Sequence, residues 1–400
     1  MDRYIARQPI FDSKLNVFAY ELLFRSGPEN FFQPGESPAD DVIVNSTMLL
    51  DMQQLVGSAL AFINVDAASL SREAPLLLYP GKVVLEILET VEPSAEVVTA
   101  CRALAANQYV LALDDFLDEP KWQPLIPCIR FLKVDFRSAD YALRRSIAQR
   151  YAPKGIQMLA EKVETESELR EARDLGYSYF QGYFFCKPSM ISGRDIPGRA
   201  ATCLRLLEEC AAPELDYKAI EKSFGEEPAL TYRLLRFLNS PLLPLRCEIH
   251  DIRQAVSLLG EREFRRWVAI VALVMMAGNK PPELIRMALT RAYFCEELAR
   301  PLALAKNASE LFLMGLLSAA DALLDRSMEQ ILSELSLSPE IRVALDGGGS
   351  KFEVVYQTLL AYERGNWGRL SELAKQSGYA EEQIPDCFVM ASGRAGAVVA

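Results

Sequence analysis

The segment "VLALDDFLDEP", Val110 to Pro120, holds the feature that decides the predicted fold: a short apolar run that stops at two adjacent carboxylates. "VLAL" has the length and composition of a buried strand. Asp114 and Asp115 are neighbours of like charge, so they repel each other unless a cation lies nearby. The segment therefore predicts a buried strand whose end carries a ligand-binding pair of acids.

Seven other segments of the first half resemble this one, and helix-length segments such as residues 95–108 and 166–176 lie between most of them. Such alternation predicts parallel strands joined by crossover helices, and eight strands predict a compact (β/α)8 barrel. The first two strands are joined only by "DSKLNV", which is too short for a helix and predicts an antiparallel hairpin. The eight predicted strands are "YIARQPIF", "AYELLFR", "AFINV", "VVLEIL", "VLALDDF", "FLKVDF", "IQMLAEKV" and "YFQGYFF".

Strand patterns disappear near residue 200, and apolar residues then recur at helical spacing, as in residues 261–277 and 310–324. Proline and glycine separate these segments, for example in "GNKPP" and "DGGGS". We therefore predict an α/β barrel over residues 1–198, modified by an antiparallel first strand, and an all-helical domain over residues 199–400.

Composition excludes several classes of protein. The net charge of −11 argues against duplex DNA or an anionic membrane as the main partner. The longest apolar run, Trp267 to Ala277, is much shorter than the ~20 residues of a membrane span, so it predicts a buried helix. The N-terminus shows no secretory pattern, which predicts a cytoplasmic protein. Eight cysteines without a CxxC pair, and a single histidine, exclude a zinc-finger pattern.

Polar residues follow the apolar part of nearly every predicted strand, where a (β/α) barrel carries its chemistry. A single acid after a strand is usually a solvated loop residue or a helix cap, but recurrence over seven strands favours a common site. Oxygen ligands without histidine or cysteine suit Mg²⁺ or Mn²⁺, and two such ions form a clamp for phosphodiester hydrolysis. Lys133 would orient the attacking water or offset phosphate charge, and Arg25 would bind a phosphate oxygen in a bidentate contact. The candidate residues are Glu21, Arg25, Asn64, Glu86, Glu89, Asp114, Asp115, Lys133, Glu161 and Gln181.

As a set, these motifs resemble the EAL family of bacterial cyclic di-GMP phosphodiesterases. They are "YELLFR", with Leu22 in place of the family's alanine, "FINV", "LEILE", "LDDF", "LKVD", "AEKVE" and "QGYFF" followed by "KP". The resemblance implies two Mg²⁺ or Mn²⁺ ions, cyclic di-GMP as substrate and barrel-mediated homodimers. Glu21, Asp115 and Lys133 would be catalytic. It implies metal ligation by Glu21, Asn64, Glu86, Asp114, Asp115 and Glu161, substrate contacts from Arg25, Gln181 and Pro188, and Glu89 as anchor of the catalytic loop.

The chain departs from this family directly after the two aspartates. Active members usually continue "DDFGTGYSS", whereas this chain reads "DDFLDEPKW", with the bulky residues Leu117 to Lys121 in the loop. Two hypotheses therefore stand: a phosphodiesterase, and a catalytically silent barrel that senses cyclic di-GMP or acts as a scaffold for other proteins.

The second half resembles the HDOD domain, a helical relative of HD phosphohydrolases, through "PALTYRLLRFLNSP", "IRQAVSLLGEREFRRWV" and "LFLMGLLSAADALL". An HD hydrolase needs a His-Asp pair where this chain has Ser318 and Ala319. The one histidine, His250, cannot build a multi-histidine metal site and is predicted to be structural. The resemblance implies a non-catalytic module that binds an unknown signalling partner.

Overall fold

The computed structural model describes residues 3–26, 55–71, 74–182, 198–212, 215–226, 259–277 and 280–399, together with residues 254 and 256. It contains two compact units. One comprises residues 1–185 and 361–372, and the other residues 186–360 and 373–400. The predicted domain boundary at residue 198 stays a prediction.

The first unit is a closed barrel of eight strands in sequence order. Strands β2 to β8 run parallel, whereas β1 is antiparallel to both of its neighbours, β2 and β8. The predicted modified barrel and its opening hairpin are confirmed. The strands are β1 (Arg3–Asp12), β2 (Val17–Ser26), β3 (Leu60–Val65), β4 (Val83–Ile87), β5 (Val110–Leu113), β6 (Ile129–Asp135), β7 (Gln157–Glu161) and β8 (Tyr179–Gln181).

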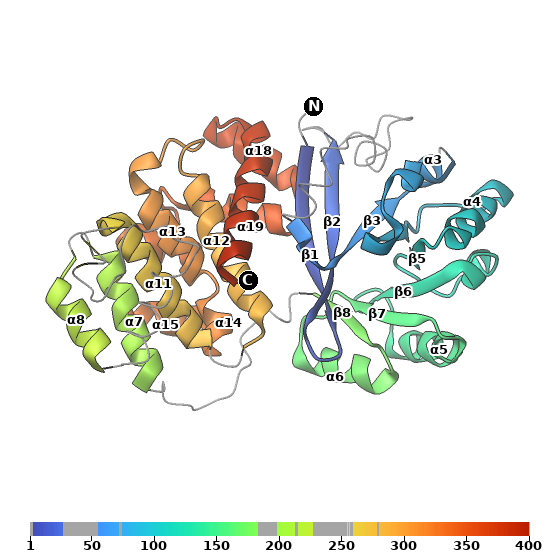
Figure 1. Ribbon diagram of the computed structural model, residues 1–400, viewed down its shortest axis with the longest axis horizontal. Coiled ribbons are helices and arrows are strands. Elements are labelled where there is room, and N and C mark those ends of the chain that lie inside the picture. The colour runs from blue at the N-terminus through green and yellow to red at the C-terminus, as the bar shows by residue number, and fades with distance from the viewer. Residues whose placement is uncertain are drawn as a thin grey trace. The chain divides into compact units, whose positions relative to one another are not determined.

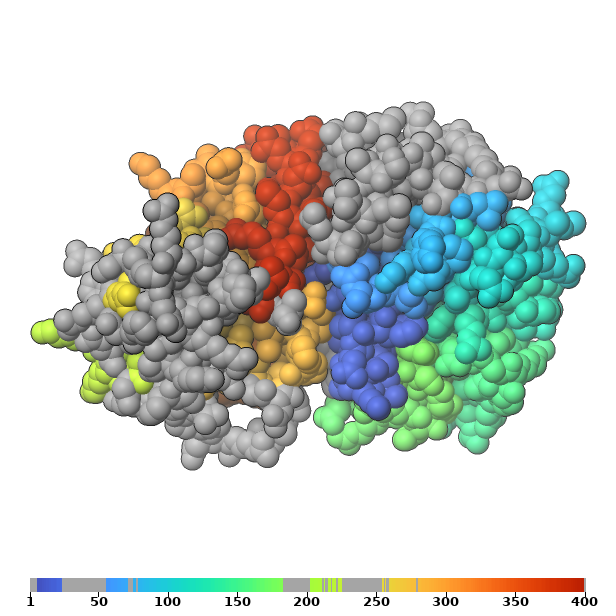
Figure 2. Space-filling view, in the orientation of Figure 1, coloured from blue at the N-terminus to red at the C-terminus, as the bar shows by residue number. Residues whose placement is uncertain are grey.

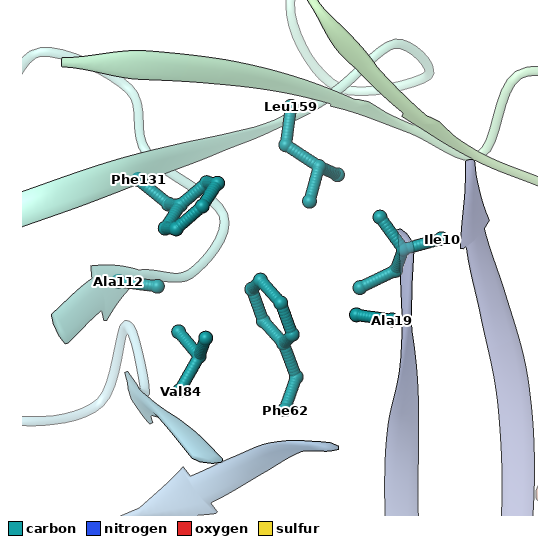
Figure 3. Packing of buried hydrophobic residues seen from close by; sticks show 7 residues of the cluster. All are labelled: Ile10, Ala19, Phe62, Val84, Ala112, Phe131 and Leu159. Carbon is teal, nitrogen blue, oxygen red and sulfur yellow. The ribbon is translucent and has the colours of Figure 1, made fainter. Parts of the chain in front are cut away.

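An apolar layer fills the barrel interior, with one side chain from each of seven strands (Figure 3). Successive strand residues point to opposite faces, so one residue per strand reaches this level from inside. The two rings of the layer, Phe62 and Phe131, meet edge to face with centroids 5.5 Å apart. The layer consists of Ile10, Ala19, Phe62, Val84, Ala112, Phe131 and Leu159.

Crossover helices α4 (Ala95–Ala106), α5 (Tyr141–Tyr151) and α6 (Glu166–Leu175) cover the outside of the barrel (Figure 1). The cyan to green segments that include them form a continuous surface in Figure 2. Ser94, Asp140 and Thr165 cap their N-termini by accepting backbone N–H bonds. The short helix α3 (Ala67–Ser71) follows β3.

The second unit is helical in its described residues. Helix α11 (Glu261–Ala277) contains the longest apolar run, which is almost entirely buried, as predicted. Helix α12 (Pro282–Glu297) packs against α13 (Ala308–Leu317) and α19 (Ile384–Val399). The other helices of this unit are α7 (Gly198–Ala211), α8 (Tyr217–Glu226), α14 (Ala320–Leu324), α15 (Met328–Glu334) and α16 (Pro339–Leu345). Helices α17 (Glu353–Glu363) and α18 (Trp367–Ser377) are divided between the two units, because residues 361–372 belong to the first.

One predicted helix is divided in the structure. The helical pattern over residues 310–324 is interrupted at Ser318 and Ala319, where α13 ends and α14 begins. Five of the six described cysteines are buried. None of the described helices has the length and apolarity needed to span a membrane. His250 lies outside the described residues.

Candidate metal site at the barrel mouth

The candidate site is a second layer of side chains stacked on the apolar layer. From β2 to β7, the site residue follows the apolar residue by two positions, which puts both on the inward face; at β5 this residue comes directly after the strand end at Leu113. Gln181 stands in the same relation to Tyr179, which packs against the apolar layer. The pairs on β2 to β7 are Ala19 and Glu21, Phe62 and Asn64, Val84 and Glu86, Ala112 and Asp114, Phe131 and Lys133, and Leu159 and Glu161.

Lys133 lies at the centre of this polar layer. Its side chain is 1% exposed, and its Nζ contacts carboxylates from four other strands. The distances from Nζ are 3.3 Å to Glu21 Oε2, 3.1 Å to Asp114 Oδ1 and 2.8 Å to Glu161 Oε1. Nζ also donates to Glu86 Oε1. One ammonium thus faces four carboxylates, which leaves an excess of negative charge in the buried polar layer.

Gln181 is fixed by two hydrogen bonds from its amide nitrogen. Nε2 donates to Glu21 Oε2 at 2.7 Å and to Gln8 Oε1 at 3.1 Å. Gln8 lies on β1, opposite Glu21 in the strand register. It is a site residue that the sequence reasoning missed. Because β1 runs in the opposite direction, its residue at the mouth precedes the apolar Ile10 by two positions instead of following it.

The two aspartates occupy different surroundings. Asp114 contacts Lys133, whereas Asp115 has a backbone φ of 40° and lies 4.0 Å from the ammonium of Lys162. Aspartate tolerates this left-handed conformation better than most residues. Carboxylate oxygens of Glu89, Asp114 and Asp115 lie within 4.8 Å of one another, close enough to share a metal ion. The structure thus brings Glu89 into the acid group, and its predicted role as loop anchor stays a prediction.

Burial and crowding change the protonation of these acids. Burial, supported by neighbouring carboxylates, raises the pKa of Glu86 well above its usual value and that of Glu161 to about 8, although Lys133 opposes both shifts. Burial and Asp114 also raise the pKa of Asp115. For Asp114 burial would raise the pKa, but Lys133 and hydrogen bonds from Glu86 and Lys133 bring it below its usual value. Without metal, protons therefore neutralise part of the excess charge.

Several buried oxygens of the layer, and one of the neighbouring Asp115, accept no hydrogen bond from any described residue. Buried polar atoms without partners are rare, so a group of them at one site indicates a missing ligand. All of these atoms are oxygens, the donor set that Mg²⁺, Mn²⁺ and Ca²⁺ prefer. The chemistry of the layer therefore fits a divalent cation. The atoms are Asn64 Oδ1, Glu86 Oε2, Asp115 Oδ1, Glu161 Oε2 and Gln181 Oε1.

We expect the metal-free protein to become less stable as pH rises from about 4.5 to about 8. Burial raises the pKa of Glu161 from 4.5 to about 8 in the folded chain, so the folded state binds more protons than the unfolded state in this window. Raising the pH then favours the unfolded state by a few kcal/mol. Urea unfolding in EDTA at pH 5, 6.5 and 8 measures the change.

Added Ca²⁺ is the control for this pH dependence. Because metal and protons compete for the same oxygens, Ca²⁺ should stabilise the protein more at pH 8 than at pH 5. Constant or increasing stability in EDTA between pH 5 and 8 would contradict a buried, protonated Glu161.

Contacts with α5 hold the altered loop after the aspartates. Asp118, with a φ of 58°, accepts hydrogen bonds from Tyr151 Oη at 2.5 Å and from Arg150 at 2.9 Å. Lys121 Nζ lies 3.5 Å from the backbone oxygen of Glu89 and 3.8 Å from the Glu92 carboxylate. Charged residues of the loop therefore hold it to α5 and to the Glu89 backbone.

The side chains of two predicted substrate-binding residues lie outside the described part of the structure. Arg25 lies on β2, where only its backbone is described, and Pro188 lies outside the described residues. In the helical unit, Ser318 is the residue that the resemblance predicted to replace the histidine of the His-Asp pair. Buried Arg291 donates to the Ser318 backbone oxygen at 3.0 Å, and Ser318 Oγ donates to Gly315 O at 2.7 Å.

The architecture now defines a class: a mixed-orientation barrel with an acidic mouth, followed by a helical domain. The family model of the HDOD domain matches residues 196–335. The chain is 33% identical over 387 residues to cyclic di-GMP phosphodiesterase CdgJ of Vibrio cholerae serotype O1, covering 95% of this chain and 89% of that protein. It is 34% identical over 398 residues to the uncharacterized protein YuxH of Bacillus subtilis, covering 97% of each.

A solved structure, Klebsiella pneumoniae BlrP1 with calcium and cyclic di-GMP, is 22% identical with a TM-score of 0.40 over 46% of this chain and 55% of that one. The EAL domain protein of Listeria monocytogenes is 21% identical with a TM-score of 0.35 over 46% of this chain and 87% of that one. The chain belongs to the EAL–HDOD family that includes CdgJ and YuxH, as its motifs predicted.

Proposed function

We propose that the barrel is a divalent-metal-dependent phosphodiesterase that opens cyclic di-GMP to the linear dinucleotide. The observation that carries this proposal is the polar layer itself. Four carboxylates share one buried lysine, and neighbouring oxygens lack hydrogen-bond partners. A full-length relative at 33% identity is named a cyclic di-GMP phosphodiesterase, which supports the choice of substrate.

The residues that would hold metal are Glu21, Asn64, Glu86, Asp114, Asp115 and Glu161, and Glu89 joins the two aspartates as a further candidate. Bound Mg²⁺ or Mn²⁺, two per barrel, would activate water and offset the charge that develops on the phosphoryl group. Lys133 keeps the carboxylates together and offers a donor at the centre of the mouth. Gln8 and Glu21 orient Gln181, whose buried Oε1 is left as an acceptor.

The helical domain is proposed to be non-catalytic. Arg291 is a permanent cation beside Ser318, where an HD hydrolase would bind its metal. Among the described residues, the acid group that could hold a metal lies in the barrel. The homodimer, the signalling partner of this domain and the cytoplasmic location remain predictions.

The altered loop favours a second candidate, a barrel that binds cyclic di-GMP without cleaving it. Loop residues 117–121 replace the family's small residues with bulky and charged ones, held to α5 and to the Glu89 backbone. In that case the nucleotide would bind and no linear product would form.

The deciding experiment is to incubate the full chain with cyclic di-GMP and Mg²⁺ or Mn²⁺ while chromatography detects linear product. We expect product from the wild type and at least a 100-fold slower rate from Glu21→Gln, which removes a carboxylate and keeps the size. Binding without product in the wild type would support the sensor, and absence of both would leave a scaffold.

A further inference from the structure

Lys162 lies at the barrel mouth directly after β7, and neither the motifs nor the proposed mechanism gives it a role. Its ammonium is 2.6 Å from Asp135 Oδ2 and 4.0 Å from Asp115 Oδ1. Asp135 is buried, and its other oxygen accepts the backbone N–H of Arg137 at 2.6 Å. Both oxygens of Asp135 are therefore engaged, which fixes the end of the Lys162 side chain beside Asp115.

The backbone of Lys162 adopts a conformation that lysine seldom takes. Its φ is 53°, in the left-handed region where glycine is favoured. A strained residue of this kind persists only when its surroundings hold it there, and such residues cluster at functional sites. The strained backbone therefore indicates a functional role for the Lys162 side chain.

Contacts of the adjacent residue Val163 with the end of β8 hold this conformation in place. Val163 donates its backbone N–H to Gln181 O at 3.0 Å, which ties the residue after Lys162 to the end of β8. Gly182 packs directly on Val163, since a Cβ at Gly182 would lie 2.2 Å from the Val163 backbone oxygen. The end of β8 thus fixes the backbone directly after Lys162.

The ammonium of Lys162 remains accessible. Its side chain is 55% exposed, although Asp135 fixes its position. A lysine ammonium has three donors, and the one hydrogen bond described for it goes to Asp135. Asp115 is too distant for a hydrogen bond, so Lys162 has donors left for an anion that enters the mouth.

We propose that Lys162 is a substrate-binding residue, whose ammonium contacts a non-bridging oxygen of the bound phosphodiester. This inference rests on the proposed function, because it assumes that a phosphodiester enters this mouth. Asp135 acts as the positioning residue that keeps the ammonium beside the metal-binding acids.

The test compares the wild type with Lys162→Met, Lys162→Gly and Lys162→Arg, each as full chain with Mn²⁺ and cyclic di-GMP. Loss of one charge-assisted contact should raise KM about 10- to 100-fold in the Met and Gly variants. Lys162→Arg should keep KM within a few-fold. Because the ammonium is half-exposed, the difference in KM should shrink in 0.5 M salt.

The glycine variant separates binding from structure. Glycine adopts a positive φ without strain, which offsets part of the stability lost with the Asp135 ion pair, so Lys162→Gly should remain folded while it still loses affinity. A normal KM in the Met and Gly variants, with an active wild type, overturns the assignment of Lys162 alone. A wild type that neither binds nor cleaves cyclic di-GMP overturns the proposed function and this assignment together.

Discussion

Lys133→Met is expected to destabilise the metal-free barrel by about 3–5 kcal/mol, the usual cost of removing one partner from a buried ion pair. Methionine matches the length of lysine but leaves Glu21, Glu86, Asp114 and Glu161 without their common cation. The four acids can then be accommodated only by taking up protons. The loss should therefore be greater at pH 8 than at pH 5.

The measurement is urea unfolding of wild type and Lys133→Met in EDTA at pH 5 and pH 8, repeated with 5 mM Ca²⁺. Calcium should restore a larger share of stability in the variant, because the ion supplies the missing positive charge. Lys121→Met is the matched control, since Lys121 is partly exposed and its pairs with Glu92 and Glu119 contribute less than about 1 kcal/mol. Equal stability of Lys133→Met and wild type in EDTA would mean that Lys133 does not hold the acids together.

Much of the fold could be predicted from the sequence because each strand carries its own signal. Eight apolar runs marked the eight strands, and a six-residue connection showed that β1 reverses direction. The division between α13 and α14 was missed, because the apolar pattern continues through Ser318 and Ala319 while the helix ends there. Apolar periodicity reports the buried face of a segment and not the breaks in its backbone.

The site could be predicted as a set of residues but not as a network. The polar residues that follow the apolar part of each predicted strand indicated which side chains of the parallel strands gather at the mouth. Gln8 was not predicted as a site residue, because β1 runs in the opposite direction and its polar position comes before the apolar one. Nor could spacing show that Lys133 sits among four acids, because the contacts join strands up to 112 residues apart. Nothing in the motif "AEKVE" indicates that the backbone of Lys162 is strained.

The two adjacent aspartates are equivalent in the sequence, but the structure predicts different effects for their substitution. Asp114→Asn removes a charge that Lys133 binds at 3.1 Å, so it should destabilise the metal-free protein by about 1–3 kcal/mol. Asp115→Asn removes a charge that burial and Asp114 disfavour, as its raised pKa shows. Asparagine also tolerates the φ of 40° at this position. We therefore expect Asp115→Asn to leave metal-free stability unchanged or to raise it by up to about 1 kcal/mol.

Both variants should nevertheless lose metal. Each variant removes one carboxylate from the group formed by Glu89, Asp114 and Asp115. We expect the affinity for Mn²⁺ to fall at least 100-fold. Loss of a residue that only supports a metal ligand typically lowers metal affinity 10- to 100-fold. Calorimetric titration with Mn²⁺ and unfolding in EDTA measure the two effects on the same samples. Asp140→Asn, which alters the cap of α5 away from the strands, serves as the control and should bind Mn²⁺ like the wild type. Normal Mn²⁺ binding by Asp115→Asn would mean that Asp115 is not a metal ligand. Equal destabilisation by Asp114→Asn and Asp115→Asn would mean that Lys133 does not distinguish the two acids.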